Sequence, residues 1–194
     1  MKISKELQEV LLEIARESIL EELTGEKLID KSYYLRKYPE LAREQAVFVT
    51  INKRQAKPNE EVLRGCIGSL LPLRPLIDDV IYNAKAAAFQ DPRFPPLSME
   101  EFRQIRIEIS VLSIPEKVEY RDADDLKNKI IPGKHGVVLQ LSGRRATFLP
   151  QVWEQLPDFD LFFQHLCIKA GLPGNCLDFH PEISRYEVTI FEEE

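Results

Sequence analysis

Two hydrophobic periodicities divide the chain into predicted helices and strands. Between residues 4 and 22 the apolar positions recur at helical spacing, and Ser4 is placed to cap the helix. A second helical stripe opens at Pro75 and must end before Asp91, because the residue preceding a proline is disfavoured in the helical region. Further helices are predicted over residues 151–155 and 158–170, the latter ending at Gly171.

An alternation of apolar and polar residues predicts the strands. It is clearest over residues 105–111, where isoleucine and valine face one way and Arg106, Glu108 and Ser110 face the other. One wet face is typical of an antiparallel sheet, not of a doubly wound parallel one. The other predicted strands are 47–51, 62–67, 137–141, 146–148 and 186–191.

The order of these elements favours an α+β fold. We expect a mostly antiparallel sheet flanked by helices. A length of 194 residues suffices for one domain with a sizeable core, or for two lobes that share it. There is no internal repeat and no low-complexity linker.

Composition and charge narrow the classes of function. The net charge of −6 argues against a general nucleic-acid binder, because phosphate backbones select basic surfaces. No apolar run reaches the roughly 18 residues of a membrane helix, and glutamates interrupt the N-terminal segment where a secretory signal would be apolar. Three cysteines, an odd and sparse set, favour a reducing cytoplasm over a disulfide framework. Without a CxxC pair or a histidine pattern, we expect neither a metal nor a cofactor.

The stretch Leu63-Arg64-Gly65-Cys66-Ile67-Gly68 holds the most distinctive candidate residue. In an extended strand Arg64 and Cys66 share a face, and a nearby guanidinium favours a thiolate. Gly65 and Gly68 allow a ligand or another backbone to approach closely. Cys66 is therefore a candidate nucleophile, but a small buried cysteine on a glycine-kinked strand is the favoured interpretation, because free cysteine is among the most buried residue types.

A nucleophilic cysteine needs a base, and His135 is the best candidate of the three histidines. It stands between Gly133-Lys134 and Gly136, just before a predicted strand, where a loop side chain can face a cleft. His165 lies in an apolar helical run and His180 has no identifiable partner. A Cys66–His135 dyad is the resulting catalytic hypothesis.

A set of basic residues suggests an anion site instead. Each lies in or beside a segment marked by glycine or proline, and arginine suits the recognition of carboxylate or phosphate. The alternative is that they are ordinary solvated charges. Gln151 could face the same cleft, while Trp153 is expected to anchor the core. The basic set is Arg64, Arg93, Lys134, Arg144 and Arg145.

Several motifs, taken in order, resemble the AMMECR domain family. They are LRGCIG at 63–68, DPRFPPL at 91–97, IEISVL at 107–112, GKHGVVL at 133–139, FLPQVW at 148–153 and KAGLP at 169–173. The resemblance implies one domain over residues 1–194, with a larger and a smaller lobe and a cleft at the LRGCIG segment. In microbes such chains are similar to protein A of the AmmeMemoRadiSam system, which implies a Memo-like protein and a radical SAM protein as partners.

The resemblance leaves two functional hypotheses. In one, the cleft binds a small anionic ligand or a partner through Arg64, Gly65, Gly68, Arg93, Lys134 and Gln151. In the other, Cys66 is the nucleophile of an enzyme and His135 its base. One departure from the family pattern is visible, because Cys176 stands near the place where family members often have a tryptophan.

Overall fold

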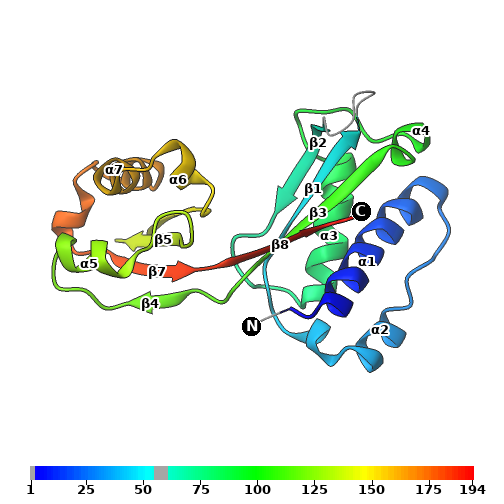
Figure 1. The fold of residues 1–194 in the computed structure, drawn as a ribbon, viewed down its shortest axis with the longest axis horizontal. Helices are drawn as coiled ribbons and strands as arrows, with labels where there is room; N and C mark the ends of the chain where they lie inside the picture. The colour runs from blue at the N-terminus through cyan, green and yellow to red at the C-terminus, as the bar shows by residue number, and fades with distance from the viewer. Residues whose placement is uncertain (1–2, 55–60) are drawn as a thin grey trace. The chain divides into compact units, whose positions relative to one another are not determined.

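The chain folds into two compact units, seen in a computed structural model that describes residues 3–54 and 61–194 (Figure 1). Unit 1 comprises Met1–Leu112 and Thr189–Glu194, and unit 2 comprises Ser113–Val188. Each unit contains a four-stranded sheet, with the orders β2-β1-β3-β8 and β4-β7-β5-β6. The predicted α+β class with a larger and a smaller lobe is confirmed, although the strands form two sheets.

Over residues 3–54, 61–112 and 189–194, unit 1 contains four helices, a 3-10 turn and four strands. Its elements are α1 (Lys5–Thr24), α2 (Lys31–Lys37), η1 (Pro39–Ala42), β1 (Val47–Arg54), β2 (Glu61–Gly68), α3 (Leu76–Phe89), α4 (Met99–Phe102), β3 (Ile105–Leu112) and β8 (Val188–Glu192). β1 pairs antiparallel with both β2 and β3.

The core of unit 1 lies between one face of its sheet and the helices α1 and α3 (Figure 1). Val47, Val49 and Ile51 of β1 are fully buried on this face, as the alternation predicts. α1 begins where expected, since the Leu7 amide donates to the Ser4 hydroxyl over 3.2 Å. It ends at Gly25, whose φ of 75° is a conformation that suits glycine.

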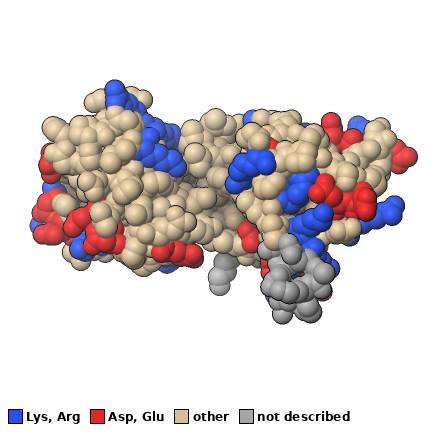
Figure 2. All heavy atoms as spheres, turned by 90° about the horizontal axis from the view of Figure 1, so that it is seen from above, with Lys and Arg blue, Asp and Glu red and all other residues tan. Residues whose placement is uncertain are grey.

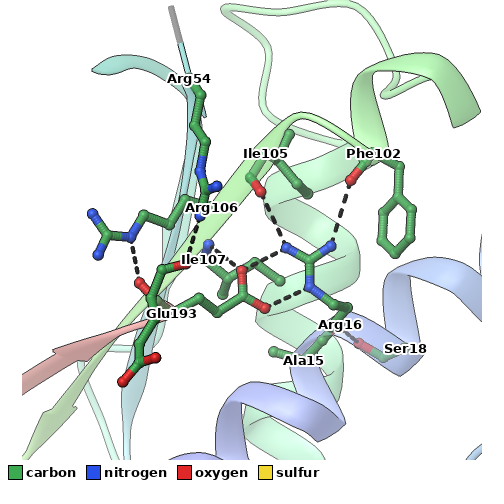
Figure 3. A network of polar contacts seen from close by, with 10 residues as sticks. Ala15, Arg16, Ser18, Arg54, Phe102, Ile105, Arg106, Ile107 and Glu193 are labelled. Carbon is green, nitrogen blue, oxygen red and sulfur yellow. Dashed lines mark hydrogen bonds and ion pairs between the residues drawn. The ribbon is translucent and has the colours of Figure 1, made fainter. Parts of the chain in front are cut away.

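The C-terminal strand is tied into unit 1 by a network around Arg16 (Figure 3). The Arg16 guanidinium binds both carboxylate oxygens of Glu193 and donates to the carbonyl of Ile105 over 3.1 Å. The Ile107 amide donates to the same carboxylate over 2.9 Å. A residue of α1 therefore holds β8 beside β3.

Unit 2 consists of the elements between β3 and β8. They are β4 (Glu116–Val118), α5 (Ala123–Lys129), β5 (Gly136–Leu141), β6 (Arg144–Phe148), α6 (Val152–Gln155), α7 (Phe159–Lys169), η2 (Cys176–Phe179) and β7 (Glu182–Tyr186). Trp153 anchors the core as expected, with its ring stacked on Phe162 at 3.6 Å between centroids. The predicted strand over 186–191 corresponds mainly to β8, while its first residue, Tyr186, ends β7, because the chain leaves one sheet there and enters the other.

Two of the cysteines contradict the expectation of free thiols. Cys167 and Cys176 form a disulfide between α7 and η2, and both are fully buried. Cys176, at the place where family members often have tryptophan, thus fills its position by cross-linking. Cys66 is the free cysteine.

Reduction of this disulfide is expected to lower the free energy of unfolding of unit 2 by about 2–3 kcal/mol. The bond closes a loop with a sequence separation of 9, and this figure is the chain entropy that such a loop removes from the unfolded state. Urea unfolding followed by Trp153 fluorescence, with and without reductant, measures the difference. A Cys66→Ala variant controls for the free thiol, and identical midpoints in both conditions would contradict the bond.

Candidate functional site

Cys66 lies on the face of the unit 1 sheet that is turned away from the core. It pairs across the ladder with Thr50, which alternates with the buried Val49 and Ile51 and so occupies the opposite face. The Thr50 hydroxyl donates to the Cys66 sulfur over 3.3 Å. The thiol is partly exposed, so it is neither a core side chain nor a freely solvated one.

Arg64 is directed to a carboxylate. The pairing register passes from Ile51↔Gly65 to Asn52↔Leu63, which leaves Arg64 as the extra residue of a β-bulge. Its Nε and Nη2 donate to the two oxygens of Glu101 over 2.9 and 3.0 Å. This guanidinium is 6% exposed and holds the pKa of Glu101 at about 2. The Arg64 guanidinium is therefore engaged in an ion pair with Glu101.

The guanidinium that contacts the backbone of Cys66 belongs to Arg93. The Cys66 amide donates to Asp91 Oδ2 over 2.9 Å, and Arg93 Nη2 donates to the Cys66 carbonyl over 3.4 Å. Arg93 also donates to Asp91 through Nε and Nη2, over 2.9 and 2.7 Å. β2 is an edge strand, so the amide and carbonyl of Cys66 that point outward have no partner strand among the residues that the structure describes. Asp91 and Arg93 form hydrogen bonds with these two groups in place of a neighbouring strand.

Electrostatics strengthen this edge cap. Asp91 is 4% exposed, and hydrogen bonds from Arg93 hold its pKa well below the ordinary value, although burial opposes them. The same hydrogen bonds, which Asp91 accepts, raise the pKa of Arg93. The side chain of Arg93 nevertheless remains 53% exposed. An arginine held in place by Asp91 thus faces solvent at the backbone of Cys66.

The two glycines of the segment admit parts of the protein itself. A Cβ at Gly65 would lie 2.1 Å from the carbonyl oxygen of Ala87 in α3. A Cβ at Gly68 would lie 2.2 Å from the ring of Phe48. The sequence suggested that a ligand or another backbone could approach these glycines closely. The structure places the backbone of Ala87 against Gly65 and the ring of Phe48 against Gly68.

The remaining candidate residues belong to unit 2. His135 is 4% exposed, and its Nδ1 accepts a hydrogen bond from the Ile131 amide over 3.0 Å. Lys134 pairs with Glu187 at 3.1 Å, and the same carboxylate lies 3.9 Å from His135 Nε2. Gln151 is exposed. The predicted site residues thus belong to two different units, and the Cys66–His135 dyad stays a prediction.

Each of the predicted anion-site cations in unit 1 has a carboxylate partner. On the face of unit 1 seen in Figure 2, basic and acidic side chains lie next to one another instead of forming a single basic patch. Sequence reasoning missed these partners, Asp91 and Glu101, and also missed Thr50. Asp91 could have been found from its place two residues before Arg93, and Thr50 from the strand alternation. In the described part of the chain no group of His, Cys, Asp and Glu could hold a metal ion.

His135 is expected to make unit 2 less stable as the pH falls. Burial lowers its pKa from 6.5, so the unfolded chain takes up a proton at a higher pH than the folded one. The free energy of unfolding should therefore fall as pH drops through about 6.5 to the lower folded pKa. Trp153, whose Nε1 donates to the His135 carbonyl over 2.8 Å, reports this in urea titrations at different pH values.

A His135→Gln variant separates this effect from the titration of carboxylates. Its unfolding free energy should depend less steeply on pH just below about 6.5 than that of the parent protein. His165→Gln is the matched control, because that ring is exposed. Equal slopes for the parent protein and His135→Gln would show that His135 has the same pKa in both states.

Fold and site together define a class: a two-unit α+β protein in which the sheet of unit 1 covers a helical core with one face, presents a thiol on the other, and has an arginine–aspartate pair on its edge at the same residue. The chain belongs to the AMMECR1 family, whose model matches residues 12–191. None of the helices in the described ranges combines the length and apolar character needed to cross a membrane.

Relatives cover the whole chain. It is 38% identical over 202 residues to the protein MK0488 of Methanopyrus kandleri, and this alignment covers 100% of this chain and 91% of that protein. A protein of Methanothermobacter thermautotrophicus is 38% identical over 196 residues, 99% of this chain and 97% of its own length. The crystal structure of uncharacterized protein PH0010 from Pyrococcus horikoshii matches with a TM-score of 0.79 and 37% identity, covering 100% of this chain and 95% of that one. These names assign no activity.

Proposed function

We propose that unit 1 binds a small ligand carrying a carboxylate or phosphate group on the sheet face around Cys66. One arrangement carries the proposal: the Arg93 guanidinium is fixed by buried Asp91 beside Cys66, yet half of its side chain is open to solvent. A guanidinium already held in place loses little entropy when it binds an anion. The thiol and the Thr50 hydroxyl supply polar contacts on the same face.

The same contacts make unit 1 alone a poor nucleophilic centre. A nucleophilic cysteine needs a group that accepts its proton. The Thr50 hydroxyl donates to the sulfur, and Asp91 accepts hydrogen bonds from the Cys66 amide and from Arg93, which depress its pKa. The enzyme alternative therefore requires His135 of unit 2 as its base.

Alkylation of the thiol tests the binding site directly. Cys66 is the free cysteine, so iodoacetamide labelling followed by mass spectrometry reports on this position. Inorganic phosphate and a panel of small dicarboxylates should slow labelling at the concentrations that raise Tm. Arg93→Lys should weaken that protection at least tenfold, while Arg103→Lys, an exposed matched control, should leave it unchanged.

A Cys66→Ser variant decides between binding and catalysis. Under the binding proposal it keeps the ligand-induced rise in Tm. A lost Tm shift, together with a covalent adduct on Cys66 that disappears in His135→Gln, would establish the enzyme instead. Unchanged labelling and unchanged Tm across the whole panel would contradict the binding site.

The resemblance to the AmmeMemoRadiSam system supports a finer proposal. We propose that the chain works as one domain in the cytoplasm, with a Memo-like protein and a radical SAM protein as partners. Co-purification of the three proteins expressed together is the test. A complex that forms equally well with Arg93→Lys would place the partner surface away from the anion site.

A further inference from the structure

A groove on unit 1, separate from the face around Cys66, lies between α1 and the C-terminal strand β8. Its volume is about 570 Å³, within the range of binding sites for small ligands and short peptides. Leu12 of α1 and Phe191 of β8 supply apolar surface, and the other lining residues are polar. They are Lys5, Gln8, Glu9, Glu13, Glu192, Glu193 and Glu194.

Charge in the groove is strongly one-sided. Five glutamates face a single lysine, Lys5. Glu193 is neutralised by Arg16 (Figure 3), and Glu192 lies 3.3 Å from Arg106. Glu9 and Glu13 stand one helical turn apart on α1, and both are exposed. An occupant of this groove must therefore be basic.

The field of these carboxylates extends along α1. The pKa of Glu17, the next residue on this stripe, is raised by burial and by the charge of Glu13. The acidic stripe is thus already strained by like charge, and a cation in the groove would relieve it.

The backbone of β8 adds a directional element. β8 is the last strand of its sheet and pairs with β3 on one side only within the described residues. An edge strand can pair with an extended peptide, which gains affinity from main-chain hydrogen bonds. Phe191–Glu194, the end of β8 and the two residues after it, would span roughly 13 Å if extended, and the stretch of α1 from Lys5 to Glu13 rises about 12 Å, so the groove matches about four extended residues.

We propose that this groove binds an extended basic segment of a partner protein, which adds to the edge of β8 and directs lysine or arginine toward Glu9 and Glu13. Alternate residues of a strand point to opposite sides, so the segment should alternate basic and apolar residues. Leu12 and Phe191 line the same groove as Glu9 and Glu13, so the aliphatic stems of the basic side chains would cover them. A second copy of this chain is disfavoured as occupant, because two acidic grooves would face each other.

A synthetic peptide tests the proposal. The probe is an acetylated, amidated hexapeptide of alternating lysine and valine, titrated by calorimetry against the full chain. Glu9→Lys/Glu13→Lys should raise its Kd at least tenfold at low ionic strength. Glu22→Lys/Glu26→Lys makes the same change in net charge outside the lining residues and should leave Kd within about twofold. Circular dichroism confirms that both variants are folded.

Two further probes separate strand addition from simple cation binding. N-methylation of alternate peptide amides removes main-chain donors while keeping charge, and should also raise Kd at least tenfold. Spermine carries charge without a backbone and should bind far more weakly than the hexapeptide. Equal binding of the methylated peptide or of spermine, an unchanged Kd in Glu9→Lys/Glu13→Lys, or no heat of binding at 1 mM peptide would each overturn the proposal.

Discussion

Gly65→Ala is expected to lower the free energy of unfolding of unit 1 by about 3 kcal/mol or more. The added Cβ would stand 2.1 Å from the carbonyl oxygen of Ala87 and 3.1 Å from its carbon, which are backbone atoms in the last turn of α3. No rotamer change can relieve that overlap, so either β2 or α3 must shift. Overpacking that displaces backbone costs at the upper end of the usual range.

Urea unfolding followed by circular dichroism measures this loss, and the rate of Cys66 alkylation reports on unit 1 by itself. Gly174→Ala is the matched control, since its Cβ would meet the flexible side chain of Gln164 at 3.0 Å and should cost less than about 1 kcal/mol. Equal stabilities for the two variants would mean that β2 and α3 do not pack as closely as the structure shows. Faster alkylation in Gly65→Ala would link this packing to the position of the thiol.

Asp79→Ala is the second substitution with a large expected effect, about 3–4 kcal/mol. Asp79 is 1% exposed in α3, and its carboxylate accepts hydrogen bonds from the Val47 amide over 2.9 Å and the Ser69 hydroxyl over 2.7 Å. Asn83 and Arg74 donate to it over 3.1 Å each. Alanine would leave several of these donors without an acceptor, two of them near the start of β1, and each unpaired buried donor costs about 1–3 kcal/mol.

Asp78→Ala provides a close control for that experiment. Asp78 is the preceding residue of α3 and pairs with Lys31, but its side chain is 36% exposed. Exposed pairs contribute about 0–1 kcal/mol, so this variant should stay within that range. Chemical denaturation of both variants in parallel gives the comparison. If Asp79→Ala were no more damaging than Asp78→Ala, the buried network would not hold the loop between β2 and α3 in solution.

These predictions concern scaffold residues, but they bear on the candidate site. Consecutive residues of β2 face opposite sides of the sheet: Gly65 packs against α3, and the Cys66 side chain lies on the open face. Packing on α3 and the Asp91–Arg93 cap at the edge therefore both fix the backbone from which the thiol projects. A ligand at Cys66 would meet a face whose geometry is set before binding.

Much of the fold could be predicted from the pattern of residues. The helices α1 and α3 and the strands β1, β2, β3, β5 and β6 follow from periodicity, because their burial repeats along the local chain. The helices predicted over 151–155 and 158–170 correspond to α6 and α7, whereas short elements such as α2, α4, α5 and β4 were missed because they lack such a repeat. α2 covers 7 residues, KSYYLRK, and buries only Tyr34, so it has no apolar stripe from which a helix could be predicted. Its N-terminus is capped by Asp30, whose carboxylate accepts a hydrogen bond from the Tyr33 amide over 3.1 Å.

The candidate site was only half predictable for a related reason. The sequence by itself determined that Cys66 and its glycines lie on a strand, that Trp153 is a core residue, and that the chain has the motifs of its family. Only the tertiary structure decided that Arg64 pairs with Glu101, 37 residues away, and that Asp91 and Arg93 cap the edge at Cys66. It also closed Cys167 and Cys176 into a disulfide. Periodicity records which side of an element is buried, whereas the choice of a charged or covalent partner depends on distances that exist only after distant segments have packed.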